Sequence, residues 1–529
     1  MPGGPAEGKT GIAIRLPTAA PARHRSRMRV VGIALLCLRA LVLEAKPFTI
    51  VACNVENLFD ADGRALYQDY RPDHYTRAHL ATKLRTAAHV IARYDDGRGP
   101  DVLILSELEV DETPALSPPD YPAIARRYAR LTLKDMLGAQ FDETIRDLPA
   151  EALLAKAFAE AGLPEYRIVV ADHRFDVTGR RRLAHKNAVF TRLPVVASRE
   201  HPTKDARAIL EVTLDVDGAS LHVFANHWKS GASSRGTEAA RRANARTLRG
   251  RLDEILGDDP DADIVLGGDF NSHYNQRDRL GGDGSAGLND ILGSQGDEAA
   301  TGDGRRELYN LWYELRPEQR GSDTYRGEWG TLMHLIVSRG LYDYRGVQYL
   351  DNSFAVGIFP GLNVDAADRP ERWRFAGVDG TGFSDHFPVS ARFVTVADGR
   401  TDRRLELRHP SREDRADTMV RKVDYAGMDL ERMALGGADL PGGAALRSEA
   451  YRGRLFLVEG PAMRERTRLL VTFRGANFEI WSYDPRFRSE LRRRYPPGTR
   501  LRFYGELDRY RGRWQFVIQD PSWIRPTAP

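Results

Sequence analysis

The sequence predicts an α/β fold in which helices cover a two-layered β core, followed by a small all-β domain. The chain has 529 residues, more than one ordinary core contains, which indicates two or three domains. Short apolar runs alternate with helix-compatible stretches up to Val396, and only strand-like runs dominate after about Leu446. A hydrophobic content of 42% and a charged content of 29% exclude a globally disordered chain.

The expected elements of the first domain follow from hydrophobic periodicity. Apolar runs bounded by polar residues predict strands at 48–53, 101–108, 167–172, 187–192, 208–216, 220–228, 262–271, 331–338 and 386–396. Polar, Ala-, Leu-, Arg- and Glu-rich stretches predict helices at 74–94, 121–160 and 235–256. We therefore expect residues 46–397 to form one domain, which we predict to be catalytic.

The N-terminal segment has the pattern of a signal peptide. Residues 28–45, MRVVGIALLCLRALVLEA, combine a basic start, an apolar middle and a small final residue. We therefore expect a leader over residues 1–45 and a secreted or periplasmic protein, with a disordered leader as the alternative. Later runs fall short of the roughly 20 apolar residues that a membrane span needs. The two cysteines, Cys37 and Cys53, are too few for a disulfide framework.

The C-terminal part is basic and aromatic. Residues 398–445 lack periodicity and are expected to be a linker, whereas 446–526 return to short strands with turn residues between them. From Arg447 to Arg525 the chain has eighteen Arg against nine Asp and Glu, although the net charge of the whole chain is only +4. Such a segment suits contact with phosphate.

Aromatic side chains alternate with arginine in this segment. The phrase PPGTRLRFYGELDRYRGRWQFVIQD resembles the late strands of an OB-fold, and single-strand binders pair a positive groove with aromatic stacking platforms. The alternative is that the aromatic rings fill a small barrel and the arginines only keep it soluble. The candidate nucleic-acid-binding residues are Trp481, Tyr504, Tyr510, Arg511 and Trp514.

Polar residues follow five of the expected apolar strands. Alone, a carboxylate or histidine at a strand end is most often a turn former, a helix cap or a packing residue. Five such clusters indicate that the side chains converge at one edge of the core. Their members are Asn54, Glu56, Glu107, Asn226, His227, Asp269, Asn271, Asp385 and His386.

These residue types fit one chemistry. Asn, Asp and Glu oxygens are hard ligands that suit Mg²⁺, Mn²⁺ or Ca²⁺. Histidines can transfer protons or bind developing phosphoryl charge. The sequence shows no Ser-His-Asp elbow, P-loop or cysteine nucleophile, so metal-assisted hydrolysis of a phosphate ester is the most economical interpretation.

Five motifs occur in a recognisable order over residues 47–396: NVENLFD, SELE, NHWKS, GGDFN and SDHFPV. The series resembles that of the endonuclease/exonuclease/phosphatase superfamily, which includes deoxyribonuclease I, exonuclease III and sphingomyelinase-type phosphodiesterases. The resemblance implies a four-layer α/β/β/α sandwich. It also implies a divalent cation, Mg²⁺ with Mn²⁺ or Ca²⁺ as alternatives, held by Asn54 and Glu107 with support from Asp385.

The resemblance also implies catalytic roles. His227 is expected to be a general acid or oxyanion stabiliser, and Asp269 to orient or deprotonate the attacking water. Asn271 would bind phosphate or metal, and His386, with Asp385 before it, would bind phosphate. Lys229 contacts phosphate in one interpretation and is simply solvated in the other.

One position departs from the pattern. The family form Leu-Asp-His or Leu-Asp-Tyr is replaced here by TLMHLIVS, with Met333 where the aspartate that orients the closing histidine is expected. Methionine cannot accept the same hydrogen bond. We therefore expect His386 to have an altered anchor, unless a neighbouring carboxylate substitutes.

Three functions are compatible with these motifs. The first is a secreted nuclease cleaving DNA or RNA with a nucleic-acid-binding tail. The second is a phosphatase or phosphodiesterase of small or lipid esters whose C-terminal domain is an adaptor. The third is a catalytically weakened nucleic-acid-binding protein. The basic aromatic tail favours the first.

Overall fold

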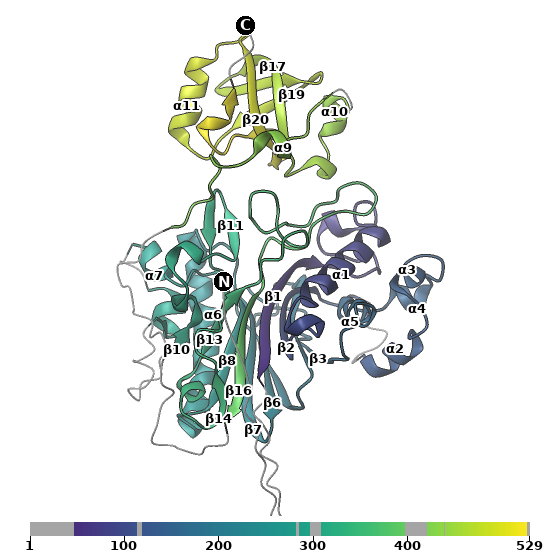
Figure 1. The fold of residues 1–529 in the computed structure, drawn as a ribbon, viewed down its shortest axis with the longest axis vertical. Helices are drawn as coiled ribbons and strands as arrows, with labels where there is room; N and C mark the ends of the chain where they lie inside the picture. The colour runs from purple at the N-terminus through teal and green to yellow at the C-terminus, as the bar shows by residue number, and fades with distance from the viewer. Residues whose placement is uncertain are drawn as a thin grey trace, which may run out of the picture. The chain divides into compact units, whose positions relative to one another are not determined.

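Two β-sheets packed face to face form the core of residues 47–396 in the computed structural model (Figure 1). Within the described residues each sheet has seven strands. The first sheet runs β14 (Gly346–Tyr349), β16 (Val389–Val396), β1 (Phe48–Leu58), β2 (Val102–Glu109), β4 (His185–Thr191) and β3 (Arg167–Val170), with β15 (Ala355–Val356) beside β16. The second runs β5 (Val195–His201), β6 (Ile209–Val216), β7 (Ala219–His227), β8 (Asp263–Asp269), β13 (Met333–Val337), β10 (Leu308–Asn310) and β9 (Ser294–Gln295).

The structure describes residues 47–113, 119–281, 285–296, 308–396, 420–437 and 440–525. The expected leader, including the signal-peptide pattern at 28–45, lies outside these residues. Within the described ranges, no helix has both the length and the hydropathy required to cross a membrane. The mixed α/β core with two sheets, expected from the sequence, is confirmed.

Both faces of the central strands are buried, which explains their continuous apolar runs. In β1, Ile50 and Ala52 face the cluster between the sheets, whereas Val51 and Cys53 face a separate cluster on the outer side. The first strand of the domain also pairs with its last, so β1, purple, lies beside β16, green, in Figure 1. Gly267 of β8 faces Ile104 of the other sheet, where an added Cβ would approach Ile104 Cδ1 to 2.4 Å.

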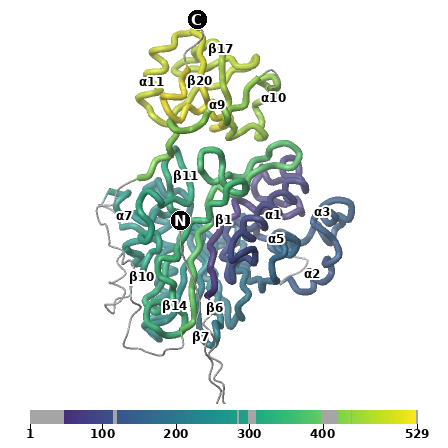
Figure 2. The backbone as a smooth tube through the Cα atoms, in the orientation of Figure 1, coloured from purple at the N-terminus to yellow at the C-terminus, as the bar shows by residue number. Residues whose placement is uncertain are grey.

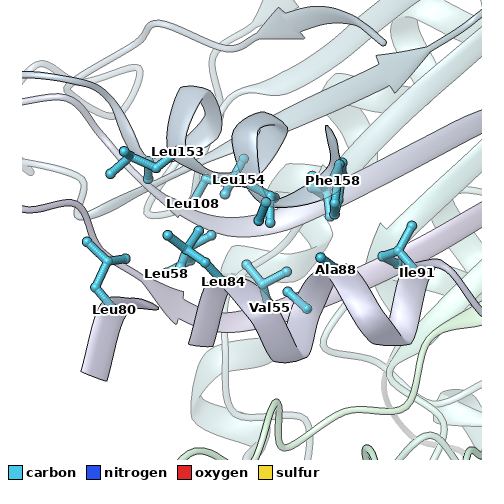
Figure 3. Packing of buried hydrophobic residues seen from close by; sticks show 14 of the residues in the cluster. Val55, Leu58, Leu80, Leu84, Ala88, Ile91, Leu108, Leu153, Leu154 and Phe158 are labelled. Carbon is cyan, nitrogen blue, oxygen red and sulfur yellow. The ribbon is translucent and has the colours of Figure 1, made fainter. Parts of the chain in front are cut away.

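Helices cover the outer face of the first sheet. Helix α1 (Arg77–Ile91) begins after Thr76, whose hydroxyl accepts a hydrogen bond from the backbone of His79. Figures 2 and 3 show α1 beside α5 (Ala150–Glu160), and their apolar side chains pack together over the ends of β1 and β2. The labelled residues in Figure 3 are Val55, Leu58, Leu80, Leu84, Ala88, Ile91, Leu108, Leu153, Leu154 and Phe158.

The stretch 121–160 is not one helix but four. Side-chain caps at Asp120, Thr132 and Asp142 start new helices, and Pro149 precedes the last of them. The short helices before α5 are α2 (Tyr121–Arg127), α3 (Leu133–Met136) and α4 (Glu143–Arg146).

One long helix, α6 (Arg235–Asp258), covers the outer face of the second sheet. Its Leu248 and Leu252 lie in one cluster with Phe224 of β7 and Leu266 of β8. A two-stranded sheet, β11 (Asp323–Tyr325) and β12 (Glu328–Gly330), precedes β13. The remaining helical segments of this part are α7 (Gln276–Arg279), the π-helix η3 (Gly287–Ile291), and the 3₁₀ segments η1 (Gln68–Tyr70), η2 (Asp95–Gly97), η4 (Leu311–Glu314), η5 (Pro317–Gln319) and η6 (Arg339–Tyr342).

The C-terminal strands pair in a ring. The order is β17 (Leu455–Glu465), β18 (Arg468–Phe473), β19 (Ala476–Trp481), β21 (Arg513–Val517) and β20 (Arg500–Tyr510), and β20 pairs back with β17, while β22 (Ile524–Arg525) pairs with β20. Helix α11 (Pro485–Arg494) lies between β19 and β20 in the chain. The shorter helices are α9 (Leu430–Met433), α10 (Gly443–Leu446), η7 (Glu449–Tyr451) and η8 (Pro521–Trp523).

The described part of the expected linker packs into this C-terminal core. Leu430 belongs to the same buried cluster as Phe456, and the Trp523 indole donates to the Tyr425 carbonyl at 2.9 Å. Residues 420–437 are therefore tied to the ring rather than free. The division at residue 445 stays a sequence-based prediction.

Candidate metal and catalytic site

The candidate site lies at the carboxyl ends of two parallel strand pairs. β1 and β2 run parallel in the first sheet, and β7 and β8 run parallel in the second. Parallel strands bring their carboxyl ends to the same edge, so the polar residues that end these strands meet there. In the register of β7 and β8, His227 lies directly opposite Asp269.

Asn54 joins the two sheets at this edge. Its Nδ2 donates to Glu107 Oε1 at 3.1 Å and to Asp269 Oδ2 at 3.2 Å, while its Oδ1 accepts from the Glu56 backbone. Glu107 Oε2 accepts from the Asn57 backbone at 2.9 Å. Asn54 thus holds the two carboxylates with its amide nitrogen, which cannot bind a cation. Its expected role as a metal ligand would need the amide group to turn.

His227 faces both carboxylates. Its Nε2 lies 3.7 Å from Glu107 Oε1 and 3.6 Å from Asp269 Oδ2, and its Nδ1 is buried without a hydrogen-bond partner. Burial, with the charge of Arg207, holds the pKa of His227 well below its ordinary value. The ring is therefore neutral near pH 7, the form that binds a metal or accepts a proton.

Asp269 has the properties of a general base. Burial raises its pKa to about 6, although His386 and a hydrogen bond from the Asn271 backbone oppose this increase. The Asn271 Nδ2 donates to the carbonyl of Trp228, the residue that follows β7, at 3.3 Å. A carboxylate with a pKa near neutrality suits proton abstraction from water.

The backbone around the site is strained. Four of its residues lie in the left-handed region: Glu56 (φ 42°), Asn57 (φ 58°), Glu107 (φ 68°) and Asn271 (φ 46°). Non-glycine residues in this region are uncommon and often mark functional sites. Gly268, with φ 121°, lies so close to β7 that a Cβ would approach the Asn226 carbonyl to 2.1 Å. The glycine thus allows His227 and Asp269 to lie side by side.

Asp385 and His386 form an ion pair at the border of the site. Asp385 Oδ1 lies 2.8 Å from His386 Nδ1, and His386 Nε2 lies 3.7 Å from Asp269 Oδ2. Burial disfavours the charged ring, but Asp385, Asp269 and Asp323 outweigh it and raise the pKa of His386 well above its ordinary value. His386 is therefore a cation that can bind phosphate. Asp385 pairs with His386 and does not belong to the group formed by Glu107, His227 and Asp269.

Asp323 supplies a carboxylate where Met333 cannot. Met333 is fully buried and lies opposite Asp269 in the register of β13 and β8. Asp323 of β11 is buried too, forms a backbone bridge with His386, and accepts from the Leu332 backbone at 3.1 Å. Its negative charge contributes to the raised pKa of His386. Sequence reasoning missed this residue because it lies ten positions before Met333, outside the motifs.

We expect Asp323→Asn to lower kcat by about tenfold, the size of effect that outer-shell partners have. Loss of the carboxylate lowers the pKa of His386, so the alkaline limb of the pH–kcat/KM profile should move to lower pH. Glu328→Gln on the exposed side of β12 is the control and should leave both unchanged. A lower rate with an unmoved alkaline limb would show that Asp323 does not act through the pKa of His386.

Two further charged groups were not predicted. Lys83 of α1 is buried, donates to the Phe383 carbonyl at 3.3 Å, and has a pKa lowered to about 8 by burial. Arg372 donates to Glu56 Oε1 at 3.1 Å. Neither follows an apolar strand, so the strand-end pattern could not find them. Both place positive charge beside Asp385 and would favour an anionic substrate.

The residues fit a hard divalent cation. One ligand atom each from Glu107, His227 and Asp269 lies within 4.8 Å of the others. The two closely spaced carboxylates supply hard oxygen ligands for Mg²⁺ or Mn²⁺, whereas the neutral imidazole of His227 is a softer donor. Glu107 was expected in this role, whereas His227 and Asp269 were assigned to catalysis alone.

Residues 182–395 match the model of the Endonuclease/Exonuclease/phosphatase family. The matched region contains His227, Asp269 and the Asp385–His386 pair, and the structure adds Asn54 and Glu107 from the preceding strands. Over this region the chain is similar to a family of enzymes that act on phosphate esters. None of the curated proteins compared with the chain matches it.

Solved structures similar to this phosphoesterase include truncated TDP2 from Caenorhabditis elegans, at 14% identity and a TM-score of 0.35, covering 66% of this chain and 98% of that chain. A family protein from Leptotrichia buccalis has 14% identity and a TM-score of 0.36, covering 65% and 98%. D. rerio TDP2, solved with a single-strand DNA product, has 14% identity and a TM-score of 0.34, covering 66% and 99%. The similarity to the family rests on the matched region and not on these structural likenesses.

The expected nucleic-acid-binding residues of the phosphoesterase differ in exposure. Tyr510 is 55% exposed and Arg511 stacks on its ring at 5.3 Å. Trp481 and Trp514 are half-buried beneath Arg488 and Arg509. Tyr504 corrects the prediction: it is buried in the core of the ring of strands, so its side chain offers no stacking platform. Lys229 is half-buried, and burial lowers its pKa.

Proposed function

We propose that this protein is a secreted, Mg²⁺-dependent nuclease that hydrolyses phosphodiester bonds of DNA or RNA. The observation that carries the proposal is the convergence of Asn54, Glu107, His227, Asp269 and His386 from two sheets at one edge. When bound, the cation would neutralise phosphate charge and polarise the scissile ester. The signal-peptide pattern at residues 28–45 supports secretion.

The side chains divide the chemistry between them. Asp269 accepts the proton of the attacking water, because its pKa of about 6 leaves it ionised at pH 7. His386, held as a cation by Asp385, binds the phosphoryl oxygens. Glu107 and His227 hold the cation with Asp269, while Asn54 fixes the spacing of the two carboxylates.

The C-terminal ring supports a polynucleotide substrate. Its strands pair in the order β17, β18, β19, β21, β20 and back to β17, which we interpret as an OB-type barrel. The exposed Tyr510 and Arg511, on a segment with twice as many arginines as acidic residues, suit stacking and backbone contact with a single strand.

A substrate panel tests the proposal. The full chain would be assayed on single- and double-stranded DNA, RNA, sphingomyelin, a chromogenic diester and a phosphomonoester, with Mg²⁺, Mn²⁺, Ca²⁺ or chelator. We expect polynucleotide to be the best substrate, activity to disappear with chelator, and cleavage to weaken steeply with salt. Preference for a monoester or sphingomyelin, with little salt dependence, would contradict the nuclease assignment.

The tail is tested by a double variant, Tyr510→Ala with Arg511→Ala. It should weaken binding of single-stranded DNA by about tenfold or more, because each stacked base contributes about 1–3 kcal/mol. Turnover of the chromogenic diester should stay unchanged. Met463→Ala removes another exposed side chain of the ring and is the matched control. Equal losses on both substrates would make the tail a structural element only.

A further inference from the structure

A second group of carboxylates lies at the ends of β1 and β2, separate from the catalytic group. One oxygen each from Asp60, Asp62 and Glu109 lies within 4.8 Å of the others. Asp60 is 6% exposed and Glu109 3% exposed. Carboxylates this close and this buried repel one another strongly unless they are protonated or a cation lies between them.

One oxygen of each carboxylate already accepts a hydrogen bond from the backbone. Glu109 Oε2 accepts from the Asp60 backbone at 2.8 Å, and Asp60 Oδ1 accepts from the Asp62 backbone at 2.8 Å. The other oxygens of Glu109 and Asp62, Oε1 and Oδ2, are buried without a hydrogen-bond partner. Buried polar atoms without a partner are rare in native proteins, and a cation bound between the carboxylates would satisfy both of these oxygens.

A residue outside the acidic group points to the same place. The hydroxyl of Tyr75, which precedes α1, is buried without a hydrogen-bond partner and interacts electrostatically with Glu109 and Asp60. A phenol normally finds a partner when it is buried. Tyr75 thus adds a third unsatisfied oxygen to those of Glu109 and Asp62.

Neighbouring cationic side chains are engaged elsewhere. Lys186 acts electrostatically on Glu109, but its ammonium is hydrogen-bonded to Glu151 at 3.0 Å. Arg182 pairs with Glu112. Because Lys186 and Arg182 already pair with other carboxylates, neither of them balances the charge of Asp60, Asp62 and Glu109.

We propose that Asp60, Asp62 and Glu109 bind a second divalent cation, Ca²⁺, with a structural role. Ca²⁺ accepts carboxylate oxygens at about 2.3–2.6 Å, so ligands on opposite sides are about 4.6–5.2 Å apart, whereas the shorter bonds of Mg²⁺ bring them closer. An irregular set of carboxylates also suits Ca²⁺, which tolerates flexible geometry.

The ion would connect the ends of β1 and β2, the strands that carry Asn54 and Glu107. Asp60 lies just beyond β1, and Glu109 lies two residues after Glu107 in β2. Asn57, three residues before Asp60, donates a hydrogen bond from its backbone to Glu107. Binding of Ca²⁺ would therefore fix Glu107 without taking part in the reaction.

The test uses the full chain with Glu107→Gln and Asp269→Asn, which disables the catalytic group and isolates the second site. Ca²⁺ in large excess over its Kd should raise the Tm of this variant by at least about 3 °C relative to chelator. Adding Asp62→Asn should abolish the increase, whereas adding Asp73→Asn, an exposed aspartate nearby, should not.

Calorimetric titration of Ca²⁺ into the same double variant should show one site per chain, and this result does not depend on the folding of the Asp62→Asn protein. Absence of binding, or an unchanged Tm increase in the folded Asp62→Asn protein, would overturn the proposal. Because the double variant lacks the catalytic group, neither outcome depends on whether the protein is a nuclease.

Discussion

Asp269→Asn should lower kcat by about 10³-fold or more, while the protein stays folded. The variant keeps the size of the side chain and can still accept the hydrogen bond from the Asn271 backbone. It loses the negative charge that binds the cation and accepts the proton from water. The measurement is kcat and KM on a polynucleotide and on a chromogenic diester, with Tm as a check on folding.

Asp263→Asn is the matched control, because Asp263 lies at the other end of the same strand, β8. It accepts from the Val347 backbone at 2.8 Å, and burial raises its pKa to about 8, so an amide resembles the form present at pH 7. The control should keep kcat within about threefold, the scatter expected of a change remote from the site. Full activity of Asp269→Asn would exclude Asp269 as the base.

His227→Gln should lower kcat by about 10²- to 10³-fold, because it removes the neutral imidazole between Glu107 and Asp269. If His227 holds the cation, the Mg²⁺ concentration at half-maximal rate should also rise, and excess Mn²⁺ should restore part of the rate. If it only donates a proton, the requirement for Mg²⁺ should not change.

His222→Gln tests the same substitution on the same strand, β7, away from the site. His222 Nδ1 lies 3.5 Å from Glu211 Oε1 and 3.3 Å from the Thr213 hydroxyl, so its contacts are structural. The control should keep the rate and lower Tm only slightly. An equal loss in both variants would show that β7, rather than the imidazole of His227, is sensitive to substitution.

The strand-end pattern was sufficient to predict which polar side chains lie together at this edge, because parallel strands bring their carboxyl ends to one edge. Asn54, Glu107, His227 and Asp269 each follow an apolar run, and the two-sheet core follows from the same runs. The predicted strands differ from the observed ones by only a few residues at their ends; β1, for instance, extends from 48–53 to Phe48–Leu58.

The site residues that were not predicted do not follow an apolar strand in the sequence. Lys83 reaches it from a helix, Asp323 from a short two-stranded hairpin, and Arg372 from an irregular segment. Tyr504 was misassigned because strand alternation determines that half the side chains face inward, but not which half. The breaks within 121–160 depend on capping by Thr132 and Asp142 and on Pro149, which amphipathic periodicity does not reveal.

The 3.2 Å hydrogen bond from Asn54 to Asp269 spans the gap between two separate sheets. The position of the general base relative to the first sheet is therefore set by how closely the Ile104 side chain packs against the backbone of Gly267. Enlarging Ile104, or adding a side chain at Gly267, would shift reacting groups that neither residue touches. In this enzyme, directed evolution for thermostability would have to treat the hydrophobic interior as part of the catalytic apparatus.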